Sequence, residues 1–368
     1  MEYAAYTVQG DHVILYRLYG TGPVVEVPDR IEGKRVEILA DHLFANEMSV
    51  LCDPKQMSLA RMRGNSWEVQ NGEALLALLR DAENGTPAGM PELSVEDVPV
   101  RIMKTLEKEA LCADRVSVVH IPEGVRQIGN YAFYGLYQLR EVSFPSTIQK
   151  IGWGMFNGCR KVNRLMLELK ETQELTPPAM KELLDALPNE LDVIVRRGAD
   201  ELYRLRFPAY YEEGKENTPA RIIEIIYHGT GHQYRNCFLN RVLQFDRYDE
   251  VFPLAAAQEN PQTNVHLILN RFRSGPAPKK EIQQRYLEYL RQENTVLMEE
   301  ILSDPDFSPE SELRLLDGFA FFTSALIDTS IQAASRKENT RAVSCLMEIR
   351  GRRFAGGGAG KSRSRYVL

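Results

Sequence analysis

Residues 116–167 read VSVVHIPEGVRQIGNYAFYGLYQLREVSFPSTIQKIGWGMFNGCRKVNRLML, which is two tandem copies of one pattern and the start of a third. Corresponding positions recur 23 residues apart: Ile121-Pro122 as Phe144-Pro145, Ile128-Gly129 as Ile151-Gly152, Phe133 as Phe156, Leu139 as Val162 and Val142 as Leu165. A fixed period of this size predicts a solenoid of stacked strand-and-turn units, in which each unit buries its apolar face against its neighbours.

The second copy shows what each unit needs. Residues 139–144 alternate, with Val142 and Phe144 on one face, and so predict a short strand that Pro145 ends. Gly152 is then expected to turn the chain, because glycine adopts backbone angles that other residues resist. The phenylalanine that follows in the return segment is expected to point into the core.

These residues resemble the BspA-type (Treponema-type) leucine-rich repeat, of the form x-I-P-x-x-V-x-x-I-G-x-x-A-F-x-x-C-x-x-L. The matching positions here are Ile121-Pro122, Val125, Ile128-Gly129, Ala132-Phe133 and Leu139, with Leu136 and then Cys159 at the family's cysteine position. The second copy departs from the pattern by placing Met155 where the family has alanine. Because the family is known for surface adhesion and protein recognition, the resemblance implies binding without naming the ligand.

Length and composition limit the other possibilities. The chain has 368 residues, which is room for two or three domains, and a net charge of −6, which gives no reason to expect nucleic acid or an acidic membrane as partner. The N-terminus has no basic and apolar leader, and no apolar run is long enough for insertion into a membrane. A cytoplasmic protein is therefore expected, with the cell surface as the alternative if the N-terminus was trimmed.

The five cysteines are too scattered to form a recognisable framework. They are Cys52, Cys112, Cys159, Cys237 and Cys345. Without a CxxC pair they indicate neither a disulfide framework nor a zinc knuckle, so reduced buried thiols are expected and no cofactor is predicted.

The pattern divides the chain into six parts. They are an N-terminal capping unit (1–46), a partly helical insertion (47–114), the BspA-like repeats (115–208), a linker and connecting segment (209–247), a helical repeat domain (248–352) and a flexible Gly-rich basic tail (353–368). In the capping unit Val25 corresponds to Val119, and residues 39–44 correspond to residues 128–133. The predicted fold class is therefore α+β, a leucine-rich-repeat β-solenoid followed by an all-α helical-repeat domain. Residues 333–347 resemble the second half of an ankyrin unit, without its Thr-Pro-Leu-His motif.

The tail carries a string similar to a phosphate-binding loop. Residues 355–362 fit a relaxed Walker A pattern, but no strand leads into them. Too few residues follow to form the helix whose N-terminus would face a phosphate. A flexible tail is therefore the favoured interpretation.

A second motif places His228 and His232 four residues apart, with Tyr234 and Arg235 close behind. On a helix this spacing binds zinc, but two intervening glycines argue against a helix and no adjacent Glu supplies a base. A turn with hydrogen-bonded histidines is expected, and a small-ligand or metal pocket made by these four residues is the alternative. No catalytic constellation is recognisable, so no catalytic residue and no metal ligand is assigned. A non-enzymatic protein is favoured, although fold alone does not exclude an enzyme.

The exposed side of the stacked strands is the first candidate for binding. With Val142 and Phe144 buried, the outward residues align in two rows, Val118, Glu141 and Arg164 in one and His120, Ser143 and Met166 in the other. Repetition places these rows on a broad concave face. The alternative is a solvated face that binds nothing.

The leading hypothesis is a bacterial-type, non-enzymatic interaction scaffold that binds a protein of unknown identity with this concave face. Two alternatives come from other classes. One is a small-ligand or metal-binding protein, or an enzyme, centred on the turn from His228 to His232. The other is a cell-surface adhesin, if the chain is exported. The sequence does not indicate the oligomeric state.

Overall fold

The computed structural model describes residues 2–45, 57–63, 66–70, 102–103, 105–170, 176–217 and 222–354. They fall in two compact units, Met1–Gln244 and Phe245–Leu368, which are described one at a time. Much of the predicted insertion (47–114), Cys52, and the tail from residue 355 with its Walker-like string lie outside the described residues.

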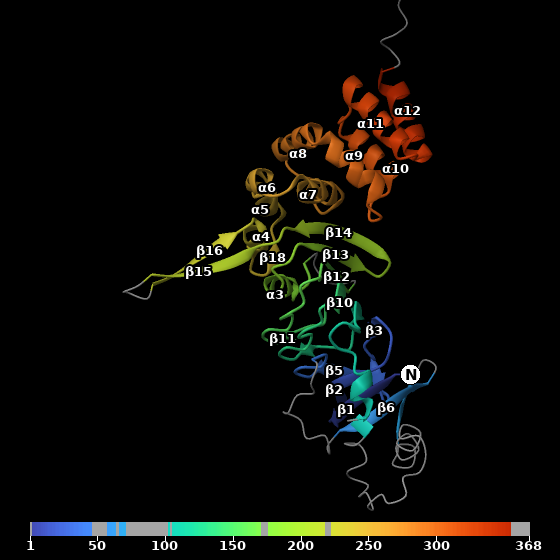
Figure 1. Cartoon of the computed structure of the whole chain (residues 1–368), viewed down its shortest axis with the longest axis vertical. Helices are drawn as coiled ribbons and strands as arrows, with labels where there is room; N and C mark the ends of the chain where they lie inside the picture. The colour runs from blue at the N-terminus through green and yellow to red at the C-terminus, as the bar shows by residue number, and fades with distance from the viewer. Residues whose placement is uncertain are drawn as a thin grey trace, which may run out of the picture. The chain divides into compact units, whose positions relative to one another are not determined.

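Two parallel ladders run along the repeats of the first unit. The first ladder belongs to a six-stranded sheet of order β14-β13-β12-β10-β8-β3. Its strands are β3 (Val24–Glu26), β8 (Val118–His120), β10 (Glu141–Pro145), β12 (Arg164–Glu168), β13 (Leu191–Arg197) and β14 (Asp200–Phe207). From β3 to β13 all neighbours pair in parallel, as the successive coils of a solenoid do. Figure 1 shows β10, β12 and β13 following one another in chain order.

The second ladder belongs to an eight-stranded sheet. Its strands are β1 (Tyr3–Gln9), β2 (His12–Tyr19), β4 (Arg30–Ile31), β5 (Lys34–Leu39), β6 (Ser58–Arg63), β7 (Ser66–Val69), β9 (Gln127–Ile128) and β11 (Lys150–Ile151). Strands β5, β9 and β11 pair in parallel, one from each successive coil. The hairpin of β6 and β7 joins the edge of β1. This hairpin comes from the predicted insertion, where the sequence indicated helices and no strand; a short 3-10 helix, η2 (Glu107–Glu109), is also described there.

The register aligns strands of the predicted capping unit with those of the later coils. Val25 lies opposite Val119 in the first ladder, and Leu39 lies opposite Ile128 in the second. Behind the ladders the phenylalanines stack. The ring centroids of Phe44 and of Phe133, its counterpart in the next coil, are 5.4 Å apart. The predicted equivalence of these segments is therefore confirmed.

The glycine of the repeated Ile-Gly pair has a different role from the one predicted. Neither Gly129 nor Gly152 has a positive φ angle. A Cβ added to Gly152 would instead lie 2.2 Å from the carbonyl carbon of Gly129, and one added to Gly129 would lie 2.4 Å from the backbone nitrogen of Asp41. The expectation of a special backbone conformation is wrong. Glycine is required because adjacent coils pass too closely to admit any side chain.

The last elements of the repeat region are arranged differently from the earlier coils. Helix α3 (Met180–Asp185) precedes β13, and β14 then turns back antiparallel to β13 through Gly198, whose φ is +60°. Residues 209–247 are not a plain linker, because β15 (Tyr211–Asn217) and β16 (Ile222–His228) form a long antiparallel hairpin. Most described side chains of this hairpin are exposed, which explains why the sequence showed no buried face there. Helix α4 (Gly231–Arg235), β17 (Phe238–Leu239) and β18 (Val242–Leu243) follow.

In its described residues the second unit contains only helices, as predicted. They are α5 (Phe245–Glu250), α6 (Phe252–Gln258), α7 (Pro261–Arg273), α8 (Lys280–Gln292), α9 (Asn294–Ser303), α10 (Pro309–Gly318), α11 (Ser324–Arg336) and α12 (Thr340–Phe354). The start of α7 shows how sequence sets a boundary: Asn260 accepts a hydrogen bond from the Thr263 backbone nitrogen at 2.8 Å, and Pro261 occupies the first turn. Helix α9 packs against both α7 and α11. The ankyrin-like arrangement stays a prediction.

The repeat cysteine gives a first testable consequence of this packing. Cys159 is 3% exposed, its thiol donates to the Phe133 carbonyl oxygen at 3.0 Å, and burial raises its pKa to about 12. We expect it to resist alkylation in the folded protein at pH 8, while the less buried Cys112 reacts faster. Mass spectrometry of the alkylated peptides measures both rates, and equal rates would contradict the burial.

The same shift has a defined dependence on pH. The thiol ordinarily ionises near pH 9.0 and does so in the unfolded chain, whereas the folded state suppresses ionisation until about 12. The stabilisation is therefore complete below pH 9 and is lost as the pH rises toward 12, by at most about 1.4 kcal/mol per pH unit. Urea melts of the wild type and of Cys159→Ala at several pH values give the free energy of unfolding of each. Plotted against pH from 9 to 12, this free energy should fall more steeply in the wild type, by this contribution.

Candidate functional site

The register brings the six predicted strand-face residues together. Glu141 lies opposite Val118 on one side and Arg164 on the other. Ser143 likewise lies between His120 and Met166. All six are partly exposed. The two predicted rows therefore exist as geometry, while their role in binding stays a prediction.

Neighbouring strands extend both rows. The added residues are Val24, Glu26, Asp192, Ile194, Arg204 and Arg206. Val24 is 48% exposed, whereas Ile194 is 2% exposed. The accessible part of the face, which we call the strand face, is therefore formed by β3, β8, β10 and β12.

Acidic and basic side chains alternate across the strand face and its continuation. Arg164 and Glu141 approach to 3.5 Å, and His120 lies 3.7 Å from Glu26. Beyond them Arg206 lies 2.9 Å from Asp192. The pairs Glu141–Arg164 and Glu26–His120 are partly exposed, and such pairs contribute little to stability, so they can exchange their partner for a charge on another molecule at low cost. Apolar Val24, Val118 and Met166 lie in the same rows as these side chains.

Comparison with known families concerns the same stretch. Residues 104–177 match the family model of the BspA type Leucine rich repeat region (6 copies). The predicted resemblance to this repeat family is confirmed there. The crystal structure of a T. pallidum leucine-rich repeat protein matches with 15% identity and a TM-score of 0.18, covering 45% of this chain and 71% of that chain. No curated protein matches this chain.

The structure does not bring His228 and His232 to one ligand. His228, at the end of β16, stacks on Tyr211 at 4.4 Å, and its Nε2 lies 2.9 Å from a Glu213 oxygen. His232, in α4, stacks on Tyr227 at 3.7 Å. Each imidazole has its own partners, which agrees with the favoured interpretation of hydrogen-bonded histidines.

The two histidines do not share a helix, as the intervening glycines indicated, because β16 ends at His228 and the short helix α4 begins only at Gly231. A Cβ on Gly231 would lie 2.1 Å from the Pro208 carbonyl oxygen, and one on Gly229 would lie 2.6 Å from that of Ala209. Gly229 also has a φ of +83°. Both glycines permit close contact with the residues that follow β14, so they are required for the packing of this turn.

Tyr234 and Arg235, the other two residues of the predicted pocket, lie in the core. Tyr234 is 0% exposed and Arg235 is 1% exposed. All three nitrogens of the Arg235 guanidinium donate to backbone carbonyls, and its Cζ lies 5.1 Å from the ring centroid of Tyr210 and 6.0 Å from that of Phe207. Arg235 therefore links α3 to the end of β14 and to α4.

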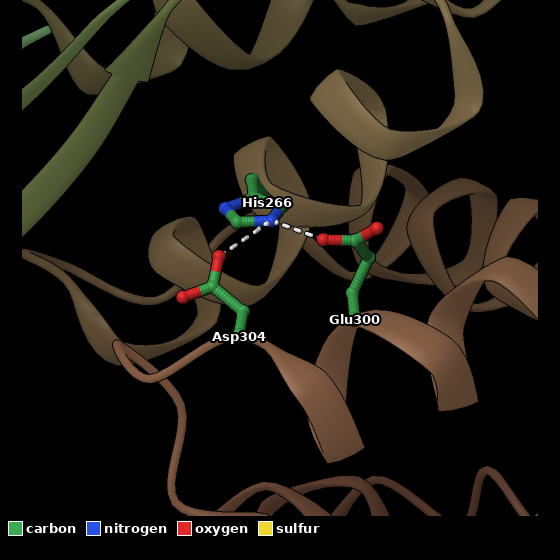
Figure 2. Close-up of side chains that lie close together, drawn as sticks. All are labelled: His266, Glu300 and Asp304. Atoms are coloured by element: carbon green, nitrogen blue, oxygen red, sulfur yellow. Dashed lines mark hydrogen bonds and ion pairs between the residues drawn. The ribbon is translucent and has the colours of Figure 1, made fainter.

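A cluster that the sequence did not reveal lies in the second unit. His266 on α7 faces Glu300 on α9 and Asp304 at the C-terminal end of that helix (Figure 2). Its Nε2 is 2.8 Å from Glu300 Oε2 and 3.4 Å from Asp304 Oδ2. The i, i+4 spacing of the two acids was a usable signal, but the histidine comes from a distant helix and no short motif joins the three.

No helix among the described residues is long and apolar enough to cross a membrane.

Proposed function

We propose that this protein binds another protein through the strand face. The observation that carries the proposal is the alignment of partly exposed residues across four parallel strands of a BspA-type repeat region. The leucine-rich-repeat family supports a protein-interaction role, and repetition supplies a broad, regular surface.

The chemistry of the strand face supports a protein partner over a small ligand. Glu141 and Arg164 present opposite charges on adjacent strands, and Met166 lies one row away. Such a face is mixed and extended, which suits a partner that contributes both apolar and charged side chains. Alternating charge would orient the partner more than it would add affinity.

A charge exchange on the strand face tests the proposal. Glu141→Arg with Arg164→Glu keeps an oppositely charged pair at the same place but reverses its polarity. We expect the wild type to capture a specific protein from a lysate of the source organism, and the exchanged variant to lose it while melting at the same temperature.

The matched control exchanges an exposed pair elsewhere. Asp328 and Arg350 lie 3.3 Å apart on α11 and α12. Asp328→Arg with Arg350→Asp should keep the partner. Retention by the strand-face variant, or equal loss in both variants, would contradict the proposal.

The adhesin alternative requires the same binding chemistry in another location. If the chain is exported, the partner is a surface or host protein. Fractionation of native cells distinguishes the two cases, because an adhesin would be recovered outside the cytoplasmic fraction.

A further inference from the structure

The cluster in the second unit gathers three metal-ligand types around one point. His266 is 8% exposed, and the exposures of Glu300 and Asp304 are 20% and 24%. One ligand atom from each lies within 4.8 Å of the others. The histidine side is therefore enclosed, and the carboxylate side opens to solvent.

The cluster places two carboxylates against one imidazole. In the described part of the chain neither Glu300 nor Asp304 forms an ion pair with a lysine or arginine. A proton on His266 would neutralise only one of the two carboxylates. A divalent cation with a neutral imidazole would neutralise both, which is the usual arrangement in protein metal sites.

The distances fit a shared ion. Two ligands bonded to one ion at about 2.1 Å lie roughly 3.0–3.4 Å apart when the angle between them is about 90–109°. The imidazole nitrogen lies 2.8 Å and 3.4 Å from the two carboxylate oxygens, close to this range.

Neighbouring groups hold the ligands in place. The Asp306 backbone nitrogen donates to Asp304 Oδ1 at 2.8 Å, which leaves Oδ2 directed toward His266. The Phe307 ring lies 4.7 Å from the imidazole. Orientation of ligands by a surrounding shell is characteristic of metal sites.

We propose that His266, Glu300 and Asp304 bind a divalent first-row transition-metal ion, with Zn²⁺ as the probe. Imidazole with two carboxylates suits Zn²⁺ or Mn²⁺, whereas Ca²⁺ takes oxygen ligands almost alone. Three protein ligands leave at least one position open on the exposed side, where water or a further ligand can bind. This proposal is independent of the strand face.

Equilibrium dialysis of the chelator-stripped full chain against ZnCl₂ tests it. We expect one Zn²⁺ per chain, not displaced by excess Ca²⁺, and affinity at least ~100-fold weaker in Glu300→Gln and in Asp304→Asn. The control is Glu299→Gln, which removes the same charge one residue earlier on α9, where the side chain is 63% exposed. It should bind as the wild type does.

Other histidines must be separated from this site. A His228→Ala, His232→Ala double variant should keep full binding. Absence of Zn²⁺ binding by the wild type, unchanged binding by the Glu300 and Asp304 variants, or loss of binding only with His228 and His232 would overturn the proposal.

A measurement on the intact chain covers the case in which a variant does not fold. Paramagnetic Mn²⁺ should broaden the NMR resonances of α7 and α9 around His266 before those of other segments. Uniform broadening, or broadening centred elsewhere, would also overturn it.

Discussion

Phe133→Ala lowers the free energy of unfolding of the first unit by about 3–5 kcal/mol, the usual cost of removing a large buried aromatic. The ring is 0% exposed and lies between two others, 5.4 Å from Phe44 and 5.3 Å from Phe156. A third ring, that of Phe144, packs edge-to-face with the Phe133 ring, and their centroids are 6.3 Å apart. The substitution therefore opens a cavity that touches three successive coils, and no single neighbour can fill it.

Tryptophan fluorescence during urea unfolding measures this effect in the correct unit. The chain has two tryptophans, Trp67 and Trp153, and both belong to the first unit. Tyr134→Ala is the matched control, because this adjacent ring is 47% exposed and its loss should cost under about 1 kcal/mol. If Phe133→Ala and the control behave alike, the stacked-coil packing is wrong.

Arg235→Met is expected to cost at least about 3 kcal/mol. The guanidinium donates to the carbonyl oxygens of Leu184, Leu187, Asn189, Pro208 and Gly231, at 2.6–3.1 Å. Burial lowers its pKa to about 10, so it stays charged at neutral pH. Methionine fills much of the volume but leaves several buried carbonyls without this donor, at about 1–3 kcal/mol each. Removal of a buried charge offsets part of that loss.

Two further variants make the Arg235 result specific. Arg235→Lys keeps the charge but cannot reach carbonyls on so many segments, so an intermediate loss is expected. Arg241→Met removes a guanidinium that is 69% exposed and should change stability by less than about 0.5 kcal/mol. A negligible effect of Arg235→Met on the urea midpoint would return Arg235 to the ligand-binding hypothesis.

Local sequence patterns predicted much of the architecture. The recurrence of Phe133 as Phe156 and the alternation around Val142 predicted the first ladder, and the likeness of Val25 to Val119 predicted how the capping unit joins it. These inferences succeeded because an apolar residue that repeats at a fixed spacing can be buried only by the equivalent residue of the next coil. In the second unit helix starts such as Asn260-Pro261 were equally local, since capping depends on adjacent residues.

The errors arose where distant segments meet. Gly152 looked like a turn residue because its sequence context does not show how closely the neighbouring coil passes. The hairpin of β15 and β16 was not predicted, because it packs few side chains into a core and residues 221–227 fit a strand or a short helix equally well. Arg235 was grouped with the two histidines because it follows them closely in sequence, whereas its carbonyl partners come from α3, the end of β14 and α4.

The sequence by itself determined the repeat, its period, the rows of the strand face and the helical character of the second unit, because each follows from spacing along the chain. Only the tertiary structure decided that Arg235 is a core residue, that His228 and His232 serve separate contacts, and that His266 meets Glu300 and Asp304. Each of these depends on the approach of segments that are far apart in sequence, and residue spacing contains no information about that distance.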